Sequence, residues 1–89
     1  MNSRTTERFR RTLGELAPEV RRRAREAYKT FAENPNHPGL RFKRVHAKLM
    51  VYSARIDLNH RALGILDGDT IVWFWIGPHD EYERLLRSM

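Results

Sequence analysis

Apolar residues recur at helical spacing through the first third of the chain. A stripe at i, i+4 and i+7 predicts a helix over Thr5–Leu16. A second stripe begins at Pro18, a residue that suits the first turn of a helix. It ends at Asn34, because the residue before a proline is pushed out of the α region. The short break between the two stripes predicts an antiparallel helical hairpin.

Beyond the Pro- and Gly-rich segment 34–39, the pattern changes from helices to strands. β-Branched and aromatic residues gather in four segments bounded by turn residues, and each segment is predicted to be a strand. The segments are Arg41–Val45, Leu49–Ile56, His60–Leu66 and Ile71–Ile76. A short helix over His79–Arg87 closes the chain. This order predicts one α+β domain over residues 1–89, with the helical hairpin packed on a four-stranded, mainly antiparallel sheet.

The segment Ile71–Ile76 is the most apolar of the predicted strands. Alternation along it predicts that Trp73 and Trp75 share one face, and that Val72 and Phe74 share the other. Both faces are then apolar. We therefore expect this strand either to be central in the sheet or to have its second face covered by a partner protein.

Length and composition exclude several classes of function. A chain of 89 residues leaves no room for a cofactor domain, and it contains no cysteine, so disulfides and thiolate chemistry are excluded. The longest apolar run is far below the roughly 20 residues that span a bilayer. Gly-rich phosphate loops, zinc motifs and paired carboxylates are missing. We expect a cytoplasmic protein that uses neither a metal nor an organic cofactor.

The net charge of +6 is concentrated in the middle of the chain. Residues 41–61 contain six basic side chains and a single acid, Asp57. The basic residues are Arg41, Lys43, Arg44, Lys48, Arg55 and Arg61. Such a segment indicates a polyanionic partner, and nucleic acid before membrane, because no strongly apolar helix face accompanies it. The alternative is a surface that serves solubility alone.

Two of these arginines are predicted to face one another. If residues 57–59 form a three-residue loop, Arg55 pairs with Arg61 across two antiparallel strands. Like charges at opposite positions are unfavourable, so the pair needs either an acidic neighbour or an anionic ligand. A guanidinium matches phosphate oxygens with two hydrogen bonds. The alternative is that Asp57, or the carboxylates near Glu81, neutralise the pair.

His79 and Tyr82 form a second candidate group, because i, i+3 spacing places them on one face of the closing helix. Histidine titrates near neutral pH and can move a proton, and tyrosine can donate to a phosphate. In the alternative, His79 only caps the helix and Tyr82 packs on the sheet. RNA cleavage by the ribose 2′-hydroxyl requires a base, an acid and cations. Histidine, tyrosine, lysine and arginine can supply them all.

Three stretches of the sequence resemble the RelE/ParE toxin superfamily of bacterial toxin–antitoxin systems. The first is Asn34–Leu40 followed by Phe42-Lys43. The second runs from Tyr52 to Ile56 and from Asn59 to Leu63. The third is Ile76–Tyr82, which is similar to the "IGxHxxY" ending of the family. Together they span most of the chain and are most similar to the RelE, YoeB, YafQ and HigB group.

The resemblance implies a RelE-like fold and a toxin that cleaves mRNA in the ribosomal A site without a metal. It implies catalytic roles for Arg61, His79 and Tyr82, and RNA-binding roles for Lys43 and Arg55. The charge pattern adds Arg41 and Lys48 to the expected RNA-binding residues. A cognate antitoxin is the implied protein partner, and it would hold the toxin inactive. Two alternatives remain open: a ParE-like inhibitor of DNA gyrase, and a non-toxic member that binds nucleic acid or antitoxin.

Overall fold

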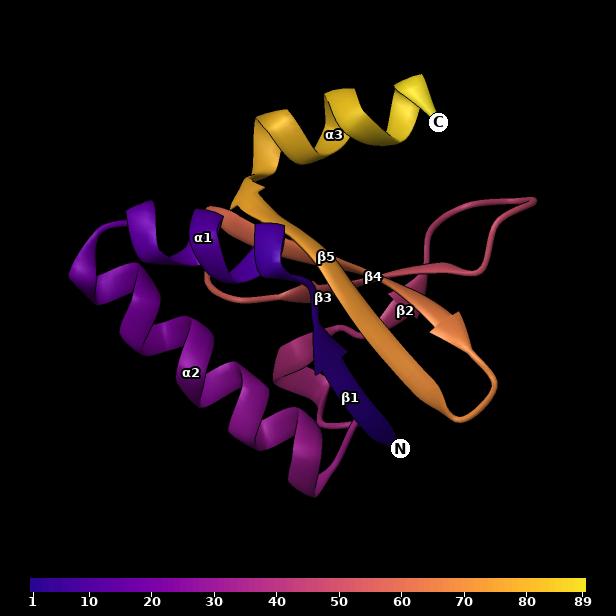
Figure 1. The fold of residues 1–89 in the computed structure, drawn as a ribbon, viewed down its shortest axis with the longest axis horizontal. Helices are drawn as coiled ribbons and strands as arrows, with labels where there is room; N and C mark the ends of the chain where they lie inside the picture. Colours follow the sequence, from indigo (N-terminus) through magenta and orange to yellow (C-terminus); the bar gives the residue numbers. More distant parts are fainter.

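The computed structural model describes residues 1–89, with three α-helices and a single sheet. The elements in chain order are β1 (Asn2–Thr5), α1 (Glu7–Glu15), α2 (Pro18–Glu33), the 3₁₀ helix η1 (Pro38–Leu40), β2 (Lys43–Arg44), β3 (Val51–Arg55), β4 (His60–Asp67), β5 (Thr70–Pro78) and α3 (His79–Ser88). The strands lie in the order β1-β5-β4-β3-β2 (Figure 1). The predicted α+β class is confirmed. None of the helices combines the length and the apolar character needed to cross a membrane.

The sheet has five strands instead of the predicted four, because the first residues of the chain form a strand. β1 runs parallel to β5, with Ser3 beside Ile71 and Thr5 beside Trp73. The indole Nε1 of Trp73 donates a hydrogen bond to Ser3 Oγ at 3.0 Å. The segment has no apolar period of its own. Main-chain pairing to β5 holds it in place, and a sequence pattern does not show that pairing.

The two predicted helices form as an antiparallel hairpin. Thr6 caps the first one: its Oγ1 accepts a hydrogen bond from the backbone N–H of Phe9 at 3.0 Å. Helix α1 therefore begins at Glu7, two residues after the approximate start predicted at Thr5. Helix α2 begins at Pro18 as predicted.

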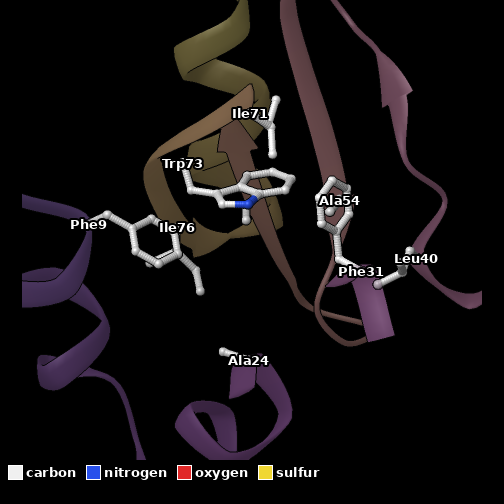
Figure 2. Packing of buried hydrophobic residues seen from close by; sticks show 9 residues of the cluster. Phe9, Ala24, Phe31, Leu40, Ala54, Ile71, Trp73 and Ile76 are labelled. Carbon is white, nitrogen blue, oxygen red and sulfur yellow. The ribbon is translucent and has the colours of Figure 1, made fainter. Parts of the chain in front are cut away.

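The larger core lies between this hairpin and the sheet. Trp73, only 3% exposed, stands at its centre, with Phe9 of α1 and Phe31 of α2 directed toward the sheet (Figure 2). The rings of Phe31 and Trp73 meet edge to face, with centroids 5.4 Å apart. Ile71 and Ile76 complete the sheet side of the core. The apolar stripes of both helices are thus buried on one sheet face.

The two tryptophans lie on opposite faces of the sheet, so the predicted alternation was wrong. The pairing of β4 with β5 shifts between Leu63 and Gly64, which pair with Trp75 and Trp73, and Phe74 is left without a partner. A bulge of this kind inserts an extra residue and reverses the alternation beyond it. Trp73 consequently enters the core under the helices, whereas Trp75 packs on the side of α3.

The smaller core lies on this second face, under α3. Tyr82 of α3 packs there against Val51 and Leu63, and all three are buried. Helix α3 crosses the sheet from the end of β5 toward the loop between β2 and β3 (Figure 1). Leu85 and Leu86 contact the same cluster, as the apolar pair in the closing helix predicts. The sheet is therefore covered on both faces.

The strands β2 and β3 are shorter than predicted, because the segment between them forms a loop. The imidazole Nδ1 of His46 accepts hydrogen bonds from the backbone N–H groups of Lys48 and Leu49, at 3.1 and 2.9 Å. These bonds turn the chain away from the sheet before β3 begins at Val51. His46 thus has a local structural role.

The close contact at Gly64 provides a test of the packing around β5. A Cβ at this position would lie 2.8 Å from Ile71 Cγ1 and 2.8 Å from Trp73 Cε3, both in the core. We expect Gly64→Ala to lower the free energy of unfolding by about 1–3 kcal/mol through overpacking. Gly14→Ala in α1 is the matched control, since a Cβ there meets nothing within 4 Å. It should stabilise the protein by about 0.5–1 kcal/mol. Urea denaturation measures both, and equal effects of the two substitutions would contradict the packing.

Candidate functional site

Four cationic side chains gather around β3 and β4. Arg55 and Arg61 are direct partners in the antiparallel register, which confirms their predicted pairing. Ala54 and Ala62 beside them belong to the core under the helices. Alternation therefore places both arginines on the face of α3. Lys43 pairs with Ser53, two residues before Arg55, and so lies on the same face. The fourth is Arg41, which follows η1.

Arg61 is the best-ordered member of this group. Its Nη1 donates to the backbone carbonyl oxygens of Asp57 and His60, at 2.7 and 2.9 Å. Partial burial, together with the charges of Arg55 and Arg41, lowers the pKa of the Arg61 guanidinium, and the neighbouring Tyr82 and Asp57 oppose this. Arginine still remains charged at neutral pH. The charges of Arg41 and Arg55 therefore act on this one guanidinium.

Arg41 lies in the left-handed backbone region, with φ of 46° and ψ of 41°. It ends η1, and its N–H donates to Pro38 O at 3.2 Å. Left-handed geometry costs a non-glycine residue about 1–2 kcal/mol, so glycine would be the better residue for stability alone. Strain of this kind is typical of functional positions.

No carboxylate forms an ion pair with a member of this cationic group. None of the ion pairs in the structure includes Arg41, Lys43, Arg55 or Arg61. The carboxylate of Asp57, which was one candidate to neutralise the arginine pair, instead contacts His60 at 3.0 Å and Arg23 at 3.4 Å. The second possible source of neutralisation, near Glu81, makes no ion pair with the arginines either. Four cations without acidic partners on one face favour an anionic ligand.

The Asp57 carboxylate organises the loop between β3 and β4. It accepts hydrogen bonds from His60 Nδ1 at 3.0 Å and from the backbone N–H of Asn59 at 2.8 Å. Burial by itself raises the pKa of the Asp57 carboxyl, but the bonds from His60 and Asn59 outweigh it and lower the pKa. The sequence offered either Asp57 or the carboxylates near Glu81 as partners for the arginines. The bond from the Asn59 N–H follows Asx-turn spacing, which the sequence shows, whereas the side-chain contact with His60 appears only in the folded loop.

His79 and Tyr82 meet at the start of α3, as their spacing predicts. The ring centroids are 5.5 Å apart. The backbone N–H of His79 donates to Asn59 O at 2.8 Å, which joins the first turn of α3 to the β3–β4 loop (Figure 1). Its imidazole is 42% exposed, with Nδ1 3.4 Å from a carboxylate oxygen of Glu83. Tyr82 is buried except for 7% of its surface.

The remaining predicted residue, Lys48, lies outside this group. It is exposed in the loop between β2 and β3, which the C-terminal end of α3 approaches: His46 Nε2 lies 3.2 Å from Met89 O. His37 accepts a hydrogen bond from the N–H of Gly39, so it caps η1. The structure thus brings together Arg41, Lys43, Arg55, Arg61 and Tyr82, with His79 beside them, and leaves Lys48 apart.

This arrangement defines a class of protein: a small basic α+β domain with a cationic face on its sheet, and a histidine and a tyrosine at its rim. The chain belongs to the ParE-like toxin domain family, whose model matches residues 18–84, and so to the RelE/ParE toxin superfamily. None of the curated protein sequences matches the chain.

Solved structures with the same fold come from several toxins. A chain of the RelB–RelE antitoxin–toxin complex from Methanococcus jannaschii is similar, with a TM-score of 0.69 and 18% identity over 92% of this chain and 96% of that chain. The YoeB dimer from Staphylococcus aureus gives 0.66 and 18%, over 89% and 97%. The DinJ–YafQ complex from E. coli gives 0.70 and 8%, over 90% and 94%. At these identities, the likeness establishes the fold.

The lowered pKa of Asp57 leads to a pH-dependent effect on stability. A carboxyl whose pKa is lower in the folded state stabilises the fold above its ordinary pKa of about 3.9, and this contribution is lost as the pH falls through the folded value. We expect Asp57→Asn to reduce the free energy of unfolding by about 1–3 kcal/mol at neutral pH, because His60 loses its charged partner. The deficit should shrink below about pH 4.

Urea denaturation across this pH range tests the effect. Asp67→Asn is the control, because Asp67 is exposed and takes part in none of the side-chain hydrogen bonds or ion pairs. A deficit for Asp57→Asn that stays constant with pH would contradict the role given to the carboxylate.

Proposed function

We propose that the protein is a toxin that cleaves mRNA in the ribosomal A site without a metal ion and so stops translation. The observation that carries the proposal is the pairing of Arg55 with Arg61, without a carboxylate partner, beside His79 and Tyr82. An RNA phosphodiester is the ligand that this set of groups suits: its anionic oxygens match the guanidinium groups, and the adjacent 2′-hydroxyl carries a proton for His79 or Tyr82 to move.

The chemistry divides among these residues as follows. The ribose 2′-hydroxyl attacks the adjacent phosphorus, and the bond from phosphorus to the 5′-oxygen of the next nucleotide breaks. Of His79 and Tyr82, one takes the proton from the 2′-hydroxyl and the other protonates the leaving 5′-oxygen, which leaves a 2′,3′-cyclic phosphate and a free 5′-hydroxyl. Arg61 stabilises the charge that develops on the phosphorane, since its guanidinium is already positioned by the loop carbonyls. Arg41, Lys43 and Arg55 bind the RNA backbone, and Lys48 contacts it farther away, from the loop between β2 and β3.

A cognate antitoxin completes the proposal. The relative from M. jannaschii is part of an antitoxin–toxin complex. In this chain, an apolar cleft of about 240 Å³ lies between the helical hairpin and the sheet, with Phe9, Tyr28 and Ile56 among its lining residues. An apolar side chain of a partner protein would fill such a cleft. The toxin would act in the cytoplasm, where the ribosomes are.

Inhibition of DNA gyrase is a second candidate function, because the matching family model is ParE-like. Such a toxin would act by binding a protein, and it would not need His79. A third reading is a non-toxic member that only binds nucleic acid or antitoxin. Growth and RNA cleavage distinguish the three.

The proposal is tested by inducing the wild type and its variants in bacteria, with growth recorded and mRNA ends mapped. We expect growth arrest with cuts phased by the ribosome. His79→Ala, Tyr82→Ala and Arg61→Ala should each lower cleavage by about a hundredfold or more, because each removes a positioned catalytic group. Arg55→Ala separates loss of RNA binding from loss of folding most clearly, because Arg55 makes no side-chain hydrogen bond or ion pair whose loss would unfold the protein.

The matched control is Arg8→Ala, which removes one exposed charge from α1, on the other side of the molecule. It should cleave like the wild type. Each variant also needs a thermal unfolding curve, since Arg61 and Tyr82 both contribute to the fold. Arrest without mRNA cuts would sink the nuclease proposal in favour of gyrase. Absence of any arrest would leave the non-toxic reading.

A further inference from the structure

Trp75 packs on the same small core as Tyr82 and has no part in the chemistry described so far. The bulge at Phe74 turns it onto the face of α3, while Trp73 is buried on the opposite face. The two indoles differ in their surroundings. Trp73 is 3% exposed and donates to Ser3 Oγ, whereas Trp75 is only partly buried. Trp75 is therefore the tryptophan that a ligand on this face can reach.

The indole of Trp75 covers the strand position beside Arg61. A Cβ on Gly77 would lie 2.6 Å from Cζ2 and 2.9 Å from Cη2 of Trp75, so the six-membered ring rests on the bare backbone of Gly77. Gly77 is the direct partner of Arg61 in the sheet. The same Cβ would lie 3.4 Å from a carboxylate oxygen of Glu81. The ring and the Glu81 carboxylate thus lie at Gly77, the strand position paired with Arg61.

The polar atom of this indole has no partner in the protein. Trp75 Nε1 makes no hydrogen bond. Every buried side-chain nitrogen or oxygen in the protein has a hydrogen-bond partner, so Trp75 Nε1 must be exposed to solvent. None of the aromatic contacts includes Trp75, although four pairs of rings pack together elsewhere in the chain, and a fifth joins His79 and Tyr82. An aromatic ring with a free N–H donor, next to a cluster of arginines, offers what a nucleobase requires.

We propose that Trp75 is a base-binding residue: its indole stacks on the nucleobase of the RNA nucleotide whose phosphate lies on Arg55 and Arg61. This rests on the proposed function, since it names a second contact for the same substrate. A base fits better here than a second phosphate, because the Glu81 carboxylate repels anions but accepts hydrogen bonds from the amino groups of bases. Stacking of this kind tolerates every base, as each has a π face.

Two short oligonucleotides separate the base contact from the phosphate contact. One is a trinucleotide of 2′-deoxyribose, which cannot be cleaved through a 2′-hydroxyl, and the other is the same trinucleotide without its central base. Binding at low salt is followed by NMR titration. We expect the wild type to bind the complete trinucleotide about fivefold to a hundredfold more tightly than the abasic one.

The variants then assign this preference to Trp75. Trp75→Leu keeps an apolar side chain but loses the stacking surface, so it should bind both trinucleotides with the abasic affinity. Trp75→Phe should retain most of the preference. Ile65→Ala removes apolar surface from a residue that is 40% exposed on β4, and it should behave like the wild type.

Three results would overturn the inference. The wild type could bind both trinucleotides equally, which would exclude a base contact. Trp75→Leu could weaken both to the same extent, which would mean that Trp75 only supports the fold. Failure of both trinucleotides to bind the wild type at low salt would contradict a phosphate site on the arginines, and the base site with it. Only the last of these also removes the support for the proposed nuclease.

Discussion

Strand β5 must bury side chains on both of its faces, and the bulge at Phe74 is the constraint on which the rest of the structure depends. Before the bulge, Ile71 and Trp73 enter the core under α1 and α2. After it, Trp75 faces α3 while Ile76 remains under the helices. One strand thus supplies large apolar residues to two cores. Without the extra residue, both tryptophans would occupy one face, and the second core would lose its contact with Trp75.

The same strand connects the cores to the candidate site. β5 leads directly into α3, so its end fixes where His79 and Tyr82 lie. The hydrogen bond from His79 N–H to Asn59 O joins this helix start to the loop that also holds Arg61. The positions of the arginine and of the proton-moving residues are therefore set by one short loop. Backbone groups make the hydrogen bonds that fix these positions, and the backbone holds its geometry better than long side chains do.

Function and stability conflict at this site. Arg55 and Arg61 face each other with like charges, and Arg41 occupies a backbone region that favours glycine. None of these three gains a carboxylate partner in return. A fold of this size has little stability to spare, so such a group is best explained by a ligand that supplies the missing negative charge. Contacts in the two cores and in the Asp57 loop, just outside the cationic face, offset the free energy lost to charge repulsion and backbone strain.

The sequence by itself determined the helices, the central strands and the pairing of Arg55 with Arg61. These follow from local periodicity and from the length of one tight turn, which act between residues close in the chain. It also marked His79 and Tyr82 as neighbours, because i, i+3 spacing is a property of a single helix. The family motifs pointed to the fold that the structure has.

Only the tertiary structure decided the rest. Strand β1 exists because the edge of β5 offers it backbone partners from the far end of the chain, at Thr70 to Trp73. The bulge arises where β4 and β5 must both pack on two cores, so alternation read from one strand cannot reveal it. The choice of Asp57 for His60 and Arg23, over the arginine pair, depends on which groups the folded loop brings within hydrogen-bonding distance. Such contacts form between residues that the fold brings together in space, and the pattern of neighbouring residues along the chain does not reveal them.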